Sequence, residues 1–368
     1  MKLNILTEGF VSYNGIGFLT PIIKNINNLK NLGTDISFFT KYKKSVLDCD
    51  VLLIDSKFYR KYKIKFGIDY IYKIFSEIKS HQCKTVFFDL GDGTSMWAMD
   101  IIPYVDRYCK SYVLKDKQLY KKQFYGSRIW TDYYKEEFSI LDTNENSINN
   151  KTGVLSESDL SKIVLSYNSS FADYSLNSRM YNTKTKKYLS HIFSVSKYLV
   201  NYSDKREFID PSINRSLELS CRMNVKYDRE GVVYHRKKAA EILNKYLKFD
   251  KIDRNLYMDE MSNSKVVVSP FGWGEVNYKD YEAILCGSLL LKPDMNHMDT
   301  FPNFFKENNV AFYKWDYSDI LDVVDNVLSN YSQNVQKARE TQDLYKYYLL
   351  SDAGQHEFCI HFNNLIKF

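Results

Sequence analysis

The chain alternates short apolar runs with longer amphipathic stretches. In the first 135 residues, apolar runs with the length of a buried strand are separated by stretches of helical periodicity. The expected strands are Leu3–Thr7, Asp35–Thr40, Val51–Ile54 and Thr85–Leu90, and the expected helices are Pro21–Leu32 and Tyr70–Ser80. Unbroken apolar strands between helices are typical of a parallel sheet that is covered on both faces. The pattern predicts a Rossmann-like domain over residues 1–135, with a glycine-containing loop at 14–17 after its first strand.

The same alternation returns in the second half of the chain. Its expected strands are Leu217–Met223, Lys265–Ser269, Ser288–Lys292 and Ala311–Tyr313. They predict a second Rossmann-like domain over 215–350, followed by a helix at 351–368 that packs back on the N-terminal domain. Residues 136–214 fit neither half and are interpreted as a connector or insertion. The predicted fold class is α/β, with two Rossmann-like domains that face each other across a cleft. Ligands are then expected outside the carboxyl ends of the strands.

The composition supports two folded domains and narrows the classes of partner. Of the 368 residues, 44% are hydrophobic and 16% are aromatic, which is enough to fill substantial cores and excludes a disordered or low-complexity chain. The formal net charge is +6, from 51 Lys and Arg against 45 Asp and Glu. A charge of this size suits an anionic ligand or an acidic membrane face, but it is too small to indicate nucleic acid. We therefore expect no nucleic-acid partner.

The cysteines and the apolar segments predict a cytoplasmic protein. The six cysteines are scattered, without a Cys-x-x-Cys pair or a Cys/His cluster at zinc spacing, so reduced thiols are expected. No segment reaches the ~18 apolar residues that a membrane span needs, and the N-terminus lacks the features of a signal peptide. The aromatic and basic stretches at 57–63 and 120–125 keep open a peripheral association with an anionic membrane surface, although a hydrated basic surface explains them at least as well.

The segment Ser269–Ser288 carries the most chemical information. It follows an expected strand and opens an expected helix, and Gly272 and Gly274 allow its backbone to turn tightly and to approach a ligand. The N-terminus of the helix offers unpaired N–H groups to an anion such as a diphosphate.

Two acidic residues and a cation add to this loop. Glu275 and Glu282 are seven residues apart, so on a helix they lie on one face, and Lys279 shares that face. Carboxylates accept hydrogen bonds from vicinal sugar hydroxyls, while an ammonium group and backbone amides bind a diphosphate. Together with Tyr278 of the buried stripe, these residues form a candidate site for a sugar nucleotide. An ordinary strand–turn–helix with a Glu–Lys surface pair remains open as the alternative.

The amino-acid sequence of this segment is similar to a known family motif. The runs Ser-Pro-Phe-Gly-x-Gly-Glu, Tyr-Lys-Asp-Tyr-Glu-Ala and Cys-Gly-Ser-Leu-Leu-Leu-Lys-Pro resemble the C-terminal donor-binding motif of GT-B glycosyltransferases, in particular the exostosin-like and family-4-like groups. The resemblance covers residues 265–315 and is only architectural over 1–135. It implies that Glu282 binds the ribose or the donor sugar. It also makes Arg222 and Arg236 candidates for the donor phosphates, with a solvated basic helix face as the alternative.

This sequence departs from the family pattern at two points. The retaining family-4 enzymes place their two glutamates eight residues apart, whereas Glu275 and Glu282 are seven apart, so we do not transfer the retaining mechanism. Lys279 stands where related sequences are expected to have Arg, which keeps the charge but loses the bidentate fork.

Two acidic residues of the first half are candidates for the catalytic base. Asp92 follows the expected strand Thr85–Leu90, at the end that faces the predicted cleft, and a carboxylate there could take the proton of an acceptor hydroxyl. Its alternative is a plain Asp-Gly turn. Glu8, after the first strand, is the second candidate. Asp48-Cys49-Asp50 has the Asp-x-Asp form of metal-dependent transferases, but it precedes a strand and is interpreted as a chance match, so no metal site is expected.

The sequence thus predicts a metal-independent GT-B glycosyltransferase. The second domain would bind a nucleotide-activated sugar as co-substrate, without another cofactor, and the first domain would bind a glycan or lipid-linked acceptor. The resemblance implies a role in surface polysaccharide or glycan biosynthesis. Two alternatives stay open, a non-catalytic nucleotide-sugar-binding protein on the same fold and a sugar-nucleotide epimerase of similar two-lobed shape.

Overall fold

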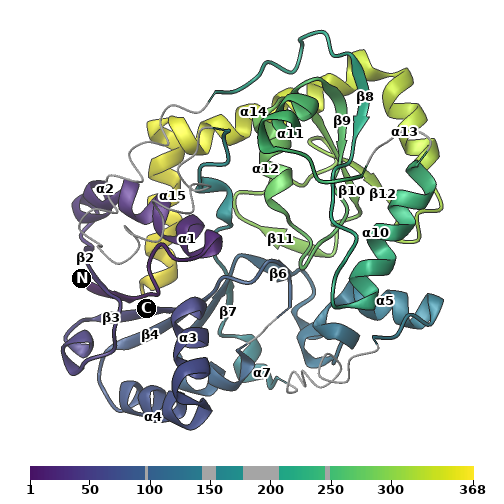
Figure 1. Cartoon of the computed structure of the whole chain (residues 1–368). Coiled ribbons are helices and arrows are strands. Elements are labelled where there is room, and N and C mark those ends of the chain that lie inside the picture. The colour runs from purple at the N-terminus through teal and green to yellow at the C-terminus, as the bar shows by residue number, and fades with distance from the viewer. Residues whose placement is uncertain (96–97, 143–154, 177–206, 245–248) are drawn as a thin grey trace.

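The structure is a computed structural model of the chain and describes residues 1–95, 98–142, 155–176, 207–244 and 249–368. Residues 177–206 of the predicted connector lie outside the described residues. Two α/β lobes are visible in Figure 1, each built on its own sheet.

The sheet of the first lobe is parallel throughout, with the strand order β2-β1-β3-β4-β5-β7 in the described part of the chain. Its strands are β1 (Lys2–Leu6), β2 (Asp35–Phe39), β3 (Val51–Asp55), β4 (Lys84–Asp89), β5 (Arg107–Lys110) and β7 (Ile163–Leu165). The first four were predicted from their apolar runs and are confirmed. The pattern missed β5, because its Lys110 has the polarity of a surface residue although it is buried in an ion pair with Asp89, Nζ to Oδ2 2.9 Å.

Helices cover this sheet, and the first of them begins earlier than predicted. The elements are α1 (Tyr13–Lys24), α2 (Ile26–Asn31), η1 (Lys44–Leu47), α3 (Ser56–Phe66), α4 (Ile68–Lys79), η2 (Met99–Tyr104), η3 (Lys117–Lys121), α7 (Glu157–Leu160) and η5 (Ser169–Phe171). Residues 14–17, predicted as a loop, form the first turns of α1. The glycine at position 17 reflects close packing, because a Cβ there would lie 2.7 Å from the Ser169 side chain. Pro21 sits inside the helix.

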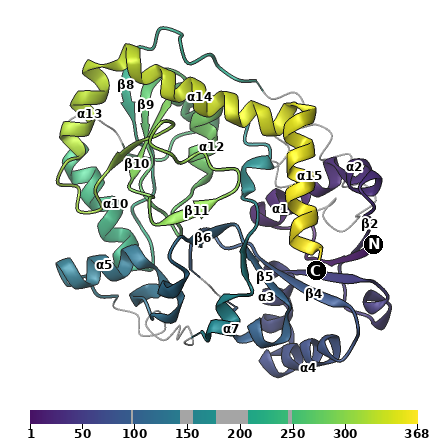
Figure 2. The same ribbon diagram turned by 180° about the vertical axis from the view of Figure 1, so that it is seen from behind.

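The second lobe repeats the architecture on a smaller sheet. Its parallel strands are β8 (Leu217–Ser220), β9 (Ser264–Val268), β10 (Leu289–Pro293) and β12 (Ala311–Tyr313), in the order β12-β10-β9-β8. The surrounding helices are η4 (Tyr125–Ser127), α5 (Ile129–Phe138), α10 (Glu230–Leu243), α11 (Arg254–Ser262), α12 (Tyr278–Leu285), α13 (Ile320–Ser329) and α14 (Tyr331–Leu350). All four predicted strands are confirmed. Helix α5 comes from the first half of the sequence but lies beside α10, as both views show (Figures 1 and 2).

Two further elements join the lobes. Strands β6 (Tyr112–Leu114) and β11 (Met298–Thr300) come from different lobes and form an antiparallel ladder. Helix α15 (Asp352–Ile366) follows α14 and lies beside the first lobe in Figure 2, where the Thr34 hydroxyl donates to the Asn363 amide oxygen at 2.9 Å. The two parallel α/β units that the sequence predicted are therefore confirmed, and their loops are in direct contact. Among the helices that the structure describes, none is long and apolar enough to cross a membrane.

Candidate functional site

The loop after β4 and the loop after β9 meet where the two lobes face each other. We call this contact between residues 90–95 and 269–277 the seam. The backbones touch there: a Cβ on Gly274 would lie 1.9 Å from the Asp92 carbonyl oxygen. Both loops follow the carboxyl ends of parallel strands, which is where open α/β sheets bind ligands. The predicted donor loop thus lies between the lobes and not on an outer face.

Glu275 fastens the second lobe to the first. Its buried carboxylate accepts hydrogen bonds from the Thr94 backbone N at 3.1 Å and from the Thr94 hydroxyl at 2.7 Å, and His297 Nε2 lies 3.3 Å away. Burial alone raises the pKa of Glu275, but the hydrogen bonds from His297 and Thr94 outweigh it, so the net pKa lies below the usual value. In this conformation, protein groups occupy both oxygens of Glu275.

The predicted helix begins three residues after Glu275, at Tyr278. The backbone N–H of Asn277 donates to the Asp280 carboxylate at 2.9 Å, which closes the first turn from the helix side. The expectation that Glu275 and Glu282 share one helix face is therefore wrong, because Glu275 belongs to the loop. An Asn-x-x-Asp capping pattern at this point was the local signal for the later start.

Glu282 lies inside the second lobe against α11. Its carboxylate accepts from Arg254 NH1 at 2.9 Å and from the Tyr257 hydroxyl at 2.9 Å. Arg254 also donates to the Tyr174 carbonyl at 3.0 Å, so it connects α11 to the segment that passes between the lobes. Nothing near position 254 in the sequence indicated Arg254 as the partner of Glu282.

The predicted cations lie behind the donor loop. Arg222 forms an ion pair with Glu260, NH2 to Oε2 2.6 Å, and this hydrogen bonding raises the pKa of Arg222. The Lys279 ammonium donates to the Arg222 carbonyl oxygen, and burial lowers the pKa of Lys279. Arg236 donates to the Phe271 carbonyl at 2.8 Å, and its NH2 lies 3.0 Å from where a Cβ on Gly272 would stand. The structure therefore brings Arg236 and Gly272 together, and it places Arg222 in a pair of its own.

A buried histidine that the sequence analysis did not assign supports the same loop. The Phe271 N–H donates to His235 Nε2 at 2.9 Å, so the proton of the neutral ring sits on Nδ1, which contacts the Tyr134 hydroxyl. That hydroxyl donates to the Trp315 carbonyl at 2.8 Å. Burial holds the pKa of His235 well below its usual value. The ring is consequently a neutral hydrogen-bonding support.

Beneath the loop lies an ion pair that is fully buried. Lys292 of β10 and Asp280 of α12 approach to 2.8 Å, Nζ to Oδ2, and neither side chain is exposed. Burial lowers the pKa of Lys292, while the Asp280 carboxylate opposes that shift. The Lys292 ammonium also donates to the Ser269 carbonyl at 3.3 Å, so the pair holds the loop at the end of β9.

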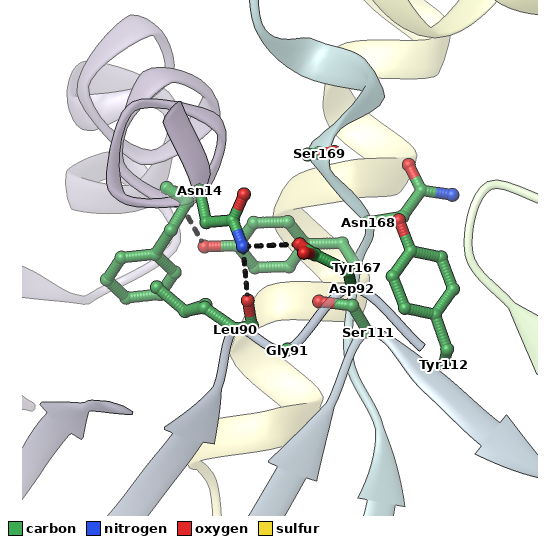
Figure 3. Close-up of a pocket in the computed structure, with 10 residues that line it drawn as sticks. Asn14, Leu90, Gly91, Asp92, Ser111, Tyr112, Tyr167, Asn168 and Ser169 are labelled. Atoms are coloured by element: carbon green, nitrogen blue, oxygen red, sulfur yellow. Dashed lines mark hydrogen bonds between the residues drawn. The ribbon is translucent and has the colours of Figure 1, made fainter. Parts of the chain in front are cut away.

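The candidate base Asp92 lines a pocket on the first-lobe side (Figure 3). The pocket is open to solvent, has a volume of about 290 Å³ with the open part included, and is lined by both polar and apolar groups. Its ten lining residues are Asn14, Phe18, Leu90, Gly91, Asp92, Ser111, Tyr112, Tyr167, Asn168 and Ser169. Within the described part of the chain, no Lys, Arg or His nitrogen lies within ion-pair distance of Asp92. Glu8 is half-buried after β1 and does not line this pocket.

An amide connects Asp92 to the donor loop. Asn14 Nδ2 donates to Asp92 Oδ1 and to the Leu90 carbonyl, both at 2.7 Å, and both bonds are drawn in Figure 3. From the second lobe, the Tyr278 hydroxyl donates to the Asn14 amide oxygen. Tyr278 was predicted as a donor-binding residue, and the structure places its hydroxyl at the seam. Asn14 was missed because it was assigned to a loop.

A second missed residue contacts the donor loop from a segment that is distant in sequence. Arg128 donates from Nε to the Trp273 carbonyl, and its guanidinium lies 5.7 Å from the centre of the Trp273 ring. Burial lowers the pKa of Arg128 to about 10. Nothing around position 128 in the sequence indicated this contact.

The Asp-x-Asp sequence lies at the opposite end of the first sheet. Asp48 pairs with the Lys2 ammonium at 2.6 Å, and Asp50 accepts from the Lys2 backbone N–H at 2.6 Å, so both hold the start of β1. Over the described residues, no group of three or more His, Cys, Asp or Glu side chains is arranged to hold a metal ion.

Comparison with known proteins gives structural but not sequence matches. No family model and no curated protein matches the sequence. Among solved structures, an alpha-glucosyltransferase in complex with UDP and a 13-mer DNA is 11% identical, covers 100% of this chain and 99% of its own, and superposes with a TM-score of 0.46. At this identity the match says nothing about activity, and the two parallel sheets of this chain are consistent with the two-lobed architecture of such enzymes. The chain has the GT-B fold.

Two further solved structures match with similar identity, coverage and TM-score. HepE from Anabaena in complex with UDP-glucose is 8% identical, with 99% of both chains covered and a TM-score of 0.44. A glycosyltransferase from Rickettsia africae is 10% identical, covers 100% of this chain and 98% of its own, and has a TM-score of 0.43.

The comparisons correct one expectation. Excluding nucleic acid as a partner was wrong, because the alpha-glucosyltransferase structures are complexes with DNA. Those proteins bind DNA in their own structures, and the modest net charge of this chain does not exclude a nucleic acid.

Proposed function

We propose that this GT-B protein is a glycosyltransferase that moves a sugar from a nucleotide-activated donor to an acceptor hydroxyl at the seam. One observation carries the proposal: the donor loop and the N-terminus of α12 lie directly opposite Asp92 and its pocket. A helix N-terminus favours the negative charge of a diphosphate, and a carboxylate beside a pocket is suited to accept a proton. The two halves of a transfer reaction then meet between the lobes.

In this reaction, the acceptor hydroxyl attacks the anomeric carbon of the donor, and the bond from that carbon to the phosphate oxygen breaks. The hydroxyl proton passes to Asp92, and the nucleoside diphosphate leaves with the electron pair. The helix N-terminus and Arg236 would stabilise the leaving phosphate without a metal ion. Because Gly274 contacts Asp92 directly, the lobes must separate along the seam to admit the donor. Their closure would then exclude water.

The finer parts of the proposal concern the acceptor and the setting. We propose a hexosyl or related sugar as the transferred group, a glycan or lipid-linked acceptor, a role in polysaccharide biosynthesis and a cytoplasmic location, with a peripheral membrane position still open. The reduced cysteines expected from the sequence and the family motif at 265–315 support these points. DNA belongs in the acceptor panel beside glycans, since nucleic acid is no longer excluded.

Binding of the nucleotide is the first test. Thermal unfolding is measured with UDP, GDP, CMP and dTDP, and with UDP-glucose. One nucleotide is expected to stabilise the folded chain by about 2.7 kcal/mol when its concentration is a hundred times its Kd. If none raises the melting temperature, the donor site is not where we place it.

Turnover then separates an enzyme from its alternatives. Asp92→Asn is expected to lower kcat about 10²- to 10⁴-fold while nucleotide affinity is kept, because only proton transfer is lost. Glu218→Gln, an exposed carboxylate-to-amide change on β8, is the matched control. Glu8→Gln tests the second candidate base, and a larger loss there than in Asp92→Asn would move the assignment to Glu8. A wild-type protein that binds but never transfers would be a binding protein, and one that converts the donor without any acceptor would be an epimerase.

A further inference from the structure

The contact chain Tyr278–Asn14–Asp92 crosses the seam and links a residue of the donor helix to the candidate base. Asn14 lies in the first turn of α1. It contacts Leu90 and Asp92, which both lie on the loop after β4 and are distant from Asn14 in sequence. Its amide oxygen receives the Tyr278 hydroxyl from the other lobe. The Asn14 side chain of the first lobe therefore contacts both the second lobe and the candidate base Asp92.

The chemistry of the partners fixes the orientation of the Asn14 amide. The Leu90 carbonyl and an ionised Asp92 carboxylate only accept hydrogen bonds, so the NH₂ group must face them. The amide oxygen is then left toward the second lobe, where only a donor satisfies it. The Tyr278 hydroxyl supplies that donor, and burial followed by the charge of Asp92 raises its pKa, so it keeps its proton.

Asn14 is not needed to cap its own helix. The Ser12 side chain performs that task by accepting from the Gly15 backbone N at 3.1 Å. The Asn14 side chain reaches instead toward the loop after β4, as Figure 3 shows. Among the described residues, Asn14 is also the one hydrogen-bond donor to Asp92, and it takes Oδ1. No described residue donates a hydrogen bond to Oδ2.

Tyr278 is held so that its hydroxyl reaches Asn14 only when the lobes are together. It is the first residue of α12, and its ring packs edge-on against Tyr13 of the first lobe, with centroids 5.4 Å apart. Tyr174, in the segment between the lobes, packs on it at the same distance of 5.4 Å. Separation of the lobes removes the hydroxyl from Asn14, because α1 and α12 belong to different lobes.

We propose that Asn14 is a positioning residue that couples closure of the two lobes to the orientation of Asp92. When the seam is closed, Tyr278 fixes the Asn14 amide, and the amide fixes one oxygen of the carboxylate. When it is open, the amide loses its outer partner, and Asp92 is free to turn. The base would be set for the acceptor only while the donor lobe is in place. This inference rests on the proposed function of Asp92.

The test compares Asn14→Ala, Tyr278→Phe and the double variant. Tyr278→Phe removes one hydroxyl and keeps the ring, so it is expected to lower kcat about tenfold with KM for the donor nearly unchanged, which matches the loss of one hydrogen bond. Asn14→Ala is expected to lower kcat further. The double variant is expected to be no slower than Asn14→Ala, because both residues act through one chain of contacts. Asn28→Ala on α2 and Tyr347→Phe on α14 are exposed matched controls.

Hydrogen–deuterium exchange provides a readout that does not need turnover. In Tyr278→Phe and Asn14→Ala, amides of the loop at 90–95 are expected to exchange faster than in the wild type, whereas the β9 amides stay protected. Unchanged exchange in that loop, or multiplicative effects on kcat in the double variant, would overturn the coupling. A wild type without any transfer but with the faster exchange in both variants would overturn the proposed function and leave the mechanical link standing.

Discussion

Asp92 and Asp280 are two aspartates near the same seam, and they differ in burial and in their hydrogen-bond partners. Asp280 belongs to the second lobe, is fully buried and faces the Lys292 ammonium at 2.8 Å. Asp92 belongs to the first lobe, lines a pocket and receives its hydrogen bond from a neutral amide at 2.7 Å. Among the described residues, the Asp280 carboxylate thus has a cation as its partner, whereas the Asp92 carboxylate has a neutral amide and faces a pocket that a ligand can enter.

Two more acidic residues of the second lobe, one in the donor loop and one on α12, also have protein partners, as Asp280 has. Glu282 is paired with Arg254, and Glu275 is held by Thr94 and His297. The residues that looked most like ligand contacts in sequence thus have structural partners in this conformation. Residue type and spacing alone did not separate them from Asp92, because the partners decide the chemistry.

The largest predicted effect tests whether the second-lobe carboxylates are structural. Lys292→Met leaves Asp280 as an unpaired buried charge and is expected to lower the free energy of unfolding by about 3–5 kcal/mol. Urea-induced unfolding measures this change. Combining it with Asp280→Asn is expected to recover part of the loss, because no buried charge then remains.

Lys84→Met is the control for this change. Its pair with Asp106 is partly exposed at 3.0 Å, and breaking it is expected to cost no more than about 1 kcal/mol. If both lysine substitutions lower the free energy of unfolding equally, the buried pair does not differ in stability from a surface pair. The contrast drawn between Asp280 and Asp92 would then be wrong.

An intermediate loss of activity is expected when a methyl group is added at the seam. Gly274→Ala places a Cβ within 1.9 Å of the Asp92 carbonyl oxygen, so the two loops must move apart by more than 1 Å. A displacement of this size between reacting groups costs about 100-fold in rate. Steady-state kinetics with a donor identified by the nucleotide screen would measure the loss, and the unfolding midpoint is expected to stay unchanged because each lobe remains intact.

Gly231→Ala is the matched variant away from the seam. Its added Cβ meets a Thr131 methyl group at 3.0 Å, a side-chain contact inside the second lobe that does not separate the lobes. Its kcat is expected to stay close to the wild-type value. If Gly274→Ala is as active as Gly231→Ala, close contact of the loops is not needed for the reaction.

The smallest predicted effect is the pH dependence of stability that arises from His235, the neutral histidine that contacts the donor loop. The pKa of His235 is held well below 6.5 by burial, so below pH 6.5 the unfolded chain binds one proton more than the folded chain at this residue. Stability is therefore expected to fall as the pH drops, by about 1.4 kcal/mol per pH unit from this group. Unfolding at pH 7, 6 and 5 measures the slope. His235→Gln should flatten it, and the exposed His81→Gln should not.

Much of the fold was predictable because it follows from local patterns. Runs such as Val51–Ile54 and Lys265–Ser269 are apolar over the whole length of a strand, so buried parallel strands were the direct interpretation. The ladder between β6 and β11 was not predictable, because it pairs residues of two lobes. The start of α1 was missed since Gly15 and Gly17 look like loop residues, although Gly17 is small to admit Ser169.

The candidate site divides in the same way. Gly272 and Gly274 were named from one continuous segment and Asp92 from its place after a strand, and their roles in binding and catalysis stay predictions. Asn14, Arg128 and His235 were missed, because their roles depend on neighbours in space that local spacing does not reveal.

The sequence by itself determined two parallel α/β lobes and a glycine-rich loop before a helix, because apolar periodicity and backbone freedom are local properties. Only the tertiary structure decided which acidic groups are paired. The partner of Glu275 is 181 residues away in the chain, and hydrogen bonds and ion pairs depend on separation in space rather than along the sequence.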